Sequence, residues 1–258
     1  MSTALVVASI SAAVALVSVG FSAWTQLHMT KRESQRNAKA VLDRCRGPLL
    51  DAAWQLGDRL DNIRHRRFFM YLRRGSGREE DARLTTLFRF AYYLGWREFV
   101  RTEVQLLRFE NNKHTRQAAG FLNDVTWVLA SDELDDGWAM LWADEQRGIG
   151  ELMTEQPPSA SSIVRGHASF HRDYKKVFAP WMERFAHDLF SPAAVKSDRL
   201  RLLQWALYGL VRQLDEEGAY RSGWIGRSAD EIRQEMLQGD STKYWEQLKE
   251  HLRVIDSH

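Results

Sequence analysis

The first thirty residues constrain this chain more than any other part of it. No Lys, Arg, Asp or Glu occurs between residues 2 and 30, and the apolar run ALVVASISAAVALVSVGFSAW covers residues 4–24. A helix of that length would span roughly 31 Å, which matches the hydrocarbon core of a bilayer. We therefore expect residues 1–30 to form a transmembrane anchor that crosses the membrane once.

A secretory signal peptide is the competing interpretation of this run. Signal peptides carry a basic segment, an apolar run of about 7 to 15 residues and a small-residue cleavage site. Here no charged side chain precedes the run, and the run is longer than that. The pattern favours an anchor that is retained, with cleavage as the less favoured alternative.

The basic residues around the run predict its orientation. None precedes it, and six follow closely: Lys31, Arg32, Arg36, Lys39, Arg44 and Arg46. Because Lys and Arg concentrate on the cytoplasmic side of a span, we expect the N-terminus outside and the bulk of the chain inside, at the inner membrane.

Small residues recur every four positions in the run, at Ala4, Ala8 and Ala12, a spacing that would permit a homodimer. A lipid-facing helix without a partner is the favoured alternative.

The charge of the remaining chain is unevenly distributed. Residues 31–78 carry 13 Lys and Arg against 5 Asp and Glu, whereas residues 79–258 carry 23 against 29. Six arginines fall within residues 63–78: Arg64, Arg66, Arg67, Arg73, Arg74 and Arg78. This candidate patch could bind anionic lipid, bind nucleic acid, or pair with the acidic body of the protein. Internal pairing is favoured, anionic lipid comes second, and no nucleic-acid partner is expected because no motif supports one.

Apolar spacing and scarce Gly and Pro predict an all-α fold. We expect a basic stalk helix over residues 31–47, a break at Gly47 and Pro48, and a cytoplasmic multi-helix bundle over residues 48–258. The sequence TEQPPSASS at residues 154–162 is the predicted internal linker. Helices are expected from Pro48 and over residues 79–110, 117–130, 138–153, 170–190, 191–217, 228–237 and 242–254.

Two clusters are the best candidates for chemistry. His167 and His171 are four residues apart, which on a helix places both imidazoles on one face, as a metal site would need. Asp144, Glu145, Arg147 and Glu151 form a second cluster, in which burial could split the carboxylate pKa values for acid and base work. Structural histidines and a solvated helix face are the favoured alternatives. The chain contains neither a phosphate-binding loop nor an H-E-x-x-H motif.

The ten tryptophans are a further candidate for function. Core packing is the favoured explanation, but Trp and Arg also anchor protein interfaces. Residues 92–101 and 243–252, which combine aromatic and charged side chains, are the stretches where we expect a partner surface first. Together these patterns predict a membrane-tethered interaction or scaffold protein with a protein partner, and neither a cofactor nor a metal. Two alternatives stay open: an all-α enzyme or metal-binding protein that uses either cluster, and a peripheral domain that senses anionic lipid.

Overall fold

The computed structural model describes residues 44–105, 113–155, 163–220, 223–226 and 234. Every regular element in these residues is helical, and no strand occurs among them, which confirms the predicted all-α class. None of the described helices is both long enough and apolar enough to cross a membrane. The predicted anchor at 1–30, most of the stalk and most of the predicted linker lie outside the described residues, as do the two predicted C-terminal helices apart from residue 234.

A first helix, at residues 44–65, opens the described chain. The α-helices that follow are α2 (Glu79–Gln105), α3 (Lys113–Ala130), α4 (Ala143–Thr154), α5 (His167–Asp173), α6 (Ala179–Leu189) and α7 (Asp198–Leu214). Shorter helical turns are η1 (Phe68–Met70), η2 (Asp135–Gly137), the π-helical η3 (Tyr174–Phe178), η4 (Pro192–Lys196) and η5 (Gly223–Gly226).

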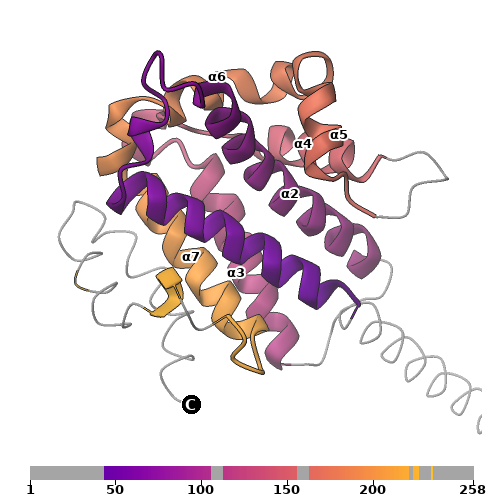
Figure 1. Ribbon diagram of the computed structural model, residues 1–258. Coiled ribbons are helices and arrows are strands. Elements are labelled where there is room, and N and C mark those ends of the chain that lie inside the picture. Colours follow the sequence, from indigo (N-terminus) through magenta and orange to yellow (C-terminus); the bar gives the residue numbers. More distant parts are fainter. Residues whose placement is uncertain (1–43, 106–112, 156–162, 221–222, 227–233, 235–258) are drawn as a thin grey trace, which may run out of the picture.

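The helices form one bundle, in which α2 packs mainly against α4 and α3 mainly against α7. Figure 1 shows the first helix running back along α2, so that the loop 66–78 joins them at the end of the bundle opposite to residue 44. In the same view α6 covers the top of the bundle. This arrangement places two possible contact surfaces, the α4–α6 face and the loop 66–78, on the outside of the molecule.

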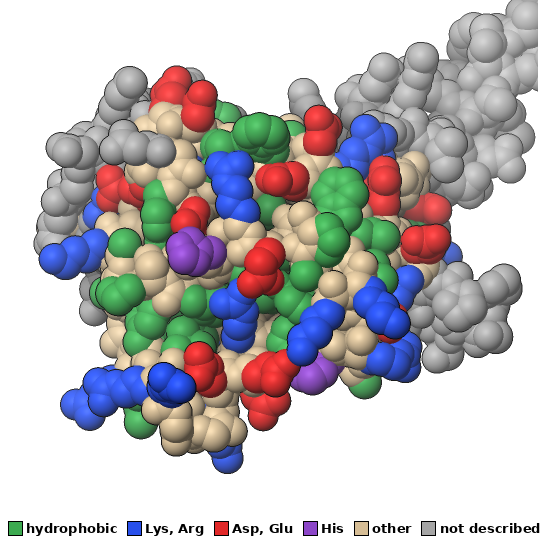
Figure 2. Space-filling model, turned by 90° about the horizontal axis from the view of Figure 1, so that it is seen from above, with side chains coloured by type: hydrophobic (Ala, Val, Ile, Leu, Met, Phe, Trp, Pro, Cys, Tyr) green, Lys and Arg blue, Asp and Glu red, His purple; other side chains and the backbone are tan. Residues whose placement is uncertain are grey.

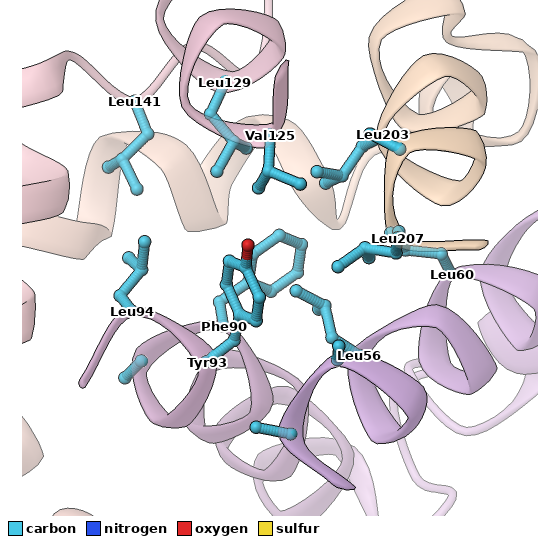
Figure 3. Packing of buried hydrophobic residues seen from close by; sticks show 14 of the residues in the cluster. Leu56, Leu60, Phe90, Tyr93, Leu94, Val125, Leu129, Leu141, Leu203 and Leu207 are labelled. Carbon is cyan, nitrogen blue, oxygen red and sulfur yellow. The ribbon is translucent and has the colours of Figure 1, made fainter. Parts of the chain in front are cut away.

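The core lies where the first helix, α2, α3 and α7 meet (Figure 3). Each supplies apolar side chains at helical spacing, among them Leu56, Phe90, Val125 and Leu207. The predicted stripe on α7, made of Leu200, Leu203, Leu207, Leu210 and Leu214, is buried as expected. Because Leu202, Trp205, Ala206 and Tyr208 are buried too, α7 is a central helix covered on most sides.

The predicted break at Gly47 and Pro48 is wrong, because the first helix already includes residues 44–47. Proline has no amide hydrogen, so Pro48 cannot donate the helical hydrogen bond to the carbonyl four residues earlier. Cys45 and Leu49 lie four residues apart and are both buried, so packing of that face offsets the lost bond. The core therefore includes residues that the charge pattern had assigned to the stalk.

Other predicted helix ends also differ from the structure. Helix α3 begins at Lys113, four residues before the predicted start, and α4 begins at Ala143 instead of Trp138. Helix α7 begins at Asp198, because Ser197 is its N-cap and accepts a hydrogen bond from the Leu200 amide at 3.1 Å. The Ser-Pro signal at 191–192 starts the short turn η4 instead.

The helix predicted over residues 170–190 exists, but it is interrupted. It starts at His167, widens into the π-helical turn Tyr174–Phe178 and continues as α6 to Leu189. Pro180 follows directly, and its ring would crowd the carbonyl four residues earlier in a regular α-helix. The wider turn relieves that clash, because it changes which carbonyl lies opposite the proline.

Candidate interaction surfaces

Two large aromatic side chains are exposed on neighbouring helices, α4 and α6. Trp142, the N-cap residue of α4, is 54% exposed, and Trp181 on α6 is 40% exposed. Arg184 lies one turn after Trp181, and its guanidinium carbon is 5.7 Å from the centroid of the Trp142 ring. Arg184, on the same helix as Trp181, therefore makes a cation–π contact with Trp142 on α4. We call Trp142, Gly148, Trp181 and Arg184 the tryptophan patch.

Gly148 explains how Trp181 is held in this patch. A Cβ atom at Gly148 would lie 2.7 Å from the Trp181 ring, closer than atoms can approach. The ring therefore rests directly on the backbone of α4, in space that any other residue would fill. One face of the indole is fixed against the protein while part of the side chain stays accessible to solvent.

The surroundings of the tryptophan patch are mixed in charge. Arg147 and Glu151 form an exposed ion pair on α4, with 3.2 Å between Nε and Oε1. Figure 2, which views the molecule from the α6 side of Figure 1, shows hydrophobic side chains reaching the surface between acidic and basic ones. Trp and Arg within a polar rim is the composition of binding hot spots in protein interfaces.

The first of the two stretches expected to form a partner surface is mostly buried in the bundle. In the stretch 92–101 on α2, every residue is buried or half-buried, and Tyr93, Leu94 and Trp96 belong to the core. The second stretch, 243–252, lies outside the described residues. Local composition could not separate these aromatic residues from Trp142 and Trp181, because burial depends on which helices cover each face.

The structure separates the six arginines of the candidate patch into two groups. Arg64 donates to the Gln204 side chain on α7 at 2.6 Å, and Arg66 pairs with the nearly buried Asp61 at 2.9 Å. Arg64 thus ties the end of the first helix to α7, whereas Arg66 pairs within its own segment. The other four arginines are exposed, and no ion pair joins any of them to another described residue. These four are Arg67, Arg73, Arg74 and Arg78. Neither the Arg64 contact nor the Arg66 contact is the predicted pairing with the acidic body, because Gln204 is uncharged and Asp61 belongs to the basic segment 31–78.

The four exposed arginines belong to an ordered loop, residues 66–78, which we call the basic loop. Phe68 anchors it, being 2% exposed and packed near Phe190 with 6.5 Å between ring centroids. Farther along, the Ser76 hydroxyl donates to the Tyr71 carbonyl at 2.6 Å. Gly75 and Gly77 have φ of 87° and 70°, values that let the chain turn sharply between these arginines. Met70 and Tyr71 are about half exposed at the same loop.

His167 and His171 lie on α5 as predicted, with 6.0 Å between their ring centroids. His167 packs edge-on against Phe88, and its Nε2 is 3.4 Å from the Thr85 hydroxyl. No group of three or more potential metal ligands occurs among the residues that the structure describes. The pair therefore gains no third ligand from the rest of the described chain.

The carboxylates of the second cluster have separate structural roles. Glu145 accepts a hydrogen bond from the Trp142 amide at 2.7 Å, and so helps to cap α4. Glu151 pairs with Arg147, and Asp144 is exposed in the first turn of α4. The fold thus does not bring two of these carboxylates together in a buried site, which the acid and base hypothesis requires.

The most extensive polar network was not predicted, and it centres on Arg199. This fully buried side chain donates to five backbone carbonyls, those of Val128, Leu129, Ser131, Leu134 and Trp138. Burial lowers the pKa of Arg199 to about 10, partly offset by Asp135 and Asp132, so it stays charged at neutral pH. The acidic turn after α3 is therefore built around this guanidinium.

Asp135 completes the network from the other side. Its backbone adopts a left-handed φ of 50°, uncommon for a residue with a side chain. Its carboxylate accepts hydrogen bonds from the Ser197 hydroxyl and from the amides of Asp198 and Arg199, at 2.6 to 3.1 Å. A carboxylate at a helix start satisfies free amides and the helix dipole. Asp135 and Ser197 together fix the start of α7.

A scan against protein-family models, a search of curated proteins and a search of solved structures each found no match to this chain.

Proposed function

We propose that this protein is a membrane-tethered helical interaction protein, whose domain binds a protein partner in the cytoplasm through the tryptophan patch. The carrying observation is the exposure of Trp142 and Trp181 on adjacent helices, with Arg184 of α6 placed over the Trp142 ring. The expected tether is the uncharged segment 1–30, and the basic residues after it favour a cytoplasmic domain. No activity on a small molecule is part of this proposal.

The chemistry of the patch supports a protein as the partner. A rigid indole loses little conformational entropy on binding, and Trp181 is already held against Gly148. Arg184 offers guanidinium donors beside two apolar rings, which suits a partner with an apolar side chain next to a carbonyl or carboxylate. Loss of one such anchor commonly weakens a protein complex by about 2 kcal/mol or more, roughly 30-fold in affinity.

Crosslinking in the native membrane tests this proposal. A photoreactive phenylalanine analogue placed at the exposed position 143, beside Trp142, should give one defined crosslinked product in the full chain. The Arg184→Glu variant should lose that product, because it removes the cation–π contact and reverses the charge. A Gly148→Ala variant should weaken it as well, because it displaces the Trp181 ring without removing any exposed side chain.

The control is a matched change on another helix. Gly120 on α3 has no atom within 4 Å of the position that a Cβ would take, so Gly120→Ala should leave the crosslinked product unchanged. Unfolding of each variant is followed by circular dichroism, so that loss of fold is not mistaken for loss of binding. A crosslinked product that persists unchanged in both Arg184→Glu and Gly148→Ala would show that the patch is not the binding surface.

A further inference from the structure

We infer that the basic loop, residues 66–78, docks on the anionic lipid leaflet to which the chain is tethered. This inference rests on the tether in the proposed function, but it concerns a different surface from the tryptophan patch. Three observations carry it: the unpaired charge of the loop, its exposed apolar tip, and its distance from the start of the first helix.

The charge of the loop is directed outwards. Arg67, Arg73, Arg74 and Arg78 are exposed without an ion pair to any described residue, while Arg64 and Arg66 are held by Gln204 and Asp61. An arginine near an anionic leaflet strengthens binding by roughly fivefold. Four arginines on one short loop are therefore enough to bias a tethered domain strongly towards the docked state.

The apolar tip of the loop distinguishes lipid from other anionic ligands. Met70 is 49% exposed and Tyr71 44% exposed, and both follow the buried anchor Phe68. Tyrosine is enriched at the headgroup level of membranes, where its ring meets apolar chains and its hydroxyl meets water. An apolar pair between arginines therefore fits a leaflet, which offers phosphate groups above and hydrocarbon below.

The dimensions of the chain allow this contact. The loop and residue 44 lie at opposite ends of the first helix, whose 22 residues span roughly 33 Å. The 13 residues from 31 to 43 could reach at most about 45 Å from the end of the predicted anchor. That reach exceeds the length of the first helix, so the tether lets the loop touch the leaflet whatever the inclination of the helix.

A probe on the loop tests the inference in the full chain. In a Cys45→Ala background, Met70→Cys carries an environment-sensitive fluorophore, and the protein is inserted into lipid nanodiscs. The discs contain either phosphatidylcholine alone or phosphatidylcholine with about one third phosphatidylserine. The probe should shift to shorter wavelength and be quenched by spin-labelled lipid only in the anionic discs, and about 1 M salt should reverse the shift.

Charge variants make the test specific. The double variant Arg73→Gln/Arg74→Gln should lower the ratio of docked to free loop by roughly 25-fold. The matched control Lys175→Gln/Lys176→Gln removes two exposed, adjacent positive charges from the π-helical turn, and should leave the ratio unchanged. An equal effect of both double variants would overturn the inference, because it would assign binding to net charge alone.

Three outcomes separate this inference from its alternatives. A chain that fails to insert into either disc overturns the tether, and the docking inference with it. A chain that inserts but leaves the probe in water in the anionic discs overturns the docking alone. A probe that responds to a single-stranded oligonucleotide in neutral discs, and not to phosphatidylserine, overturns lipid docking in favour of nucleic acid.

Discussion

Arg199 shows how one side chain can fix the conformation of a whole backbone turn. It donates to five carbonyls, of which those of Leu129 and Leu134 also accept from a backbone amide, so its removal leaves the other acceptors without this donor. Arg199→Met should lower the free energy of unfolding by about 3 to 5 kcal/mol, measured by urea denaturation. Arg199→Lys, with three donors instead of five, should recover only part of this loss. A cost below about 1 kcal/mol for Arg199→Met would contradict the role assigned to the guanidinium.

Tyr93 presents the opposite case, a buried hydroxyl that has no hydrogen-bond partner among the described residues. Figure 3 shows its oxygen among leucine and valine side chains in the core. Because an unsatisfied buried hydroxyl costs free energy, Tyr93→Phe should leave stability unchanged or raise it by about 1 kcal/mol. The matched variant Tyr174→Phe should lower stability by a similar amount, since the Tyr174 hydroxyl donates to Glu183 at 3.0 Å. Thermal and urea unfolding compare the two, and the same sign for both would contradict the assignment.

The same two tyrosines predict a loss of stability in alkali. Burial raises the pKa of Tyr93 above its ordinary value of 10.0, and burial together with Glu183 raises that of Tyr174. Above pH 10 the unfolded chain therefore ionises phenols that the native chain keeps protonated, and stability falls as the pH rises further. Urea unfolding between about pH 9 and about pH 11 should show a shallower decline in the double Phe variant than in the unchanged protein.

At the scale of the helix, two glycines predict opposite effects of the same substitution. A Cβ at Gly57 in the first helix would lie 2.0 Å from the Trp224 ring, whereas one at Gly120 in α3 meets nothing within 4 Å. Alanine stabilises a helix interior by about 0.5 to 1 kcal/mol relative to glycine, so Gly120→Ala should be stabilising. Gly57→Ala should be destabilising by about 1 to 3 kcal/mol, because the indole must move. Urea midpoints that shift in the same direction would contradict this.

The helices themselves were largely predictable, because apolar spacing and local breakers act over a few residues. The leucine stripe of α7 and the acidic first turn of α2 both led to correct assignments. The start of α7 was not predictable, because Asp135 caps it from more than sixty positions earlier in the chain. The π-helical turn before Pro180 could have been predicted locally, because a proline inside a helix indicates an irregularity in it.

The contact surfaces were predictable only in part. Sequence identified the arginine-rich stretch, yet Gln204, which binds Arg64, approaches it only in the folded bundle. Exposure of Trp142 and Trp181 depends likewise on how α6 crosses α4, as the close approach of Trp181 to Gly148 shows. Composition can propose residues for a surface, but the packing of whole helices decides which of them reach solvent.

For the whole molecule, the predicted tether has a direct test. If residues 1–30 cross the membrane, the full chain should stay in the membrane fraction through washes with high salt and alkaline carbonate, because these remove only peripheral proteins. With the predicted orientation, protease added to intact spheroplasts should spare the domain, and lysis should expose it. Release by carbonate, or digestion without lysis, would contradict the tether or its orientation respectively.

The Asp135 carboxylate binds the first amides of α7, and the Arg199 side chain binds the carbonyls of the turn. The turn and the start of α7 therefore form a single unit of local unfolding. The turn cannot open without freeing the first amides of α7, and α7 cannot fray at that end without breaking the Arg199 bonds to the carbonyls of the turn. The amide hydrogens of residues 198–201 should consequently exchange with solvent deuterium only as slowly as those of the core helices. The helix end, elsewhere the first place to loosen, is here among the last.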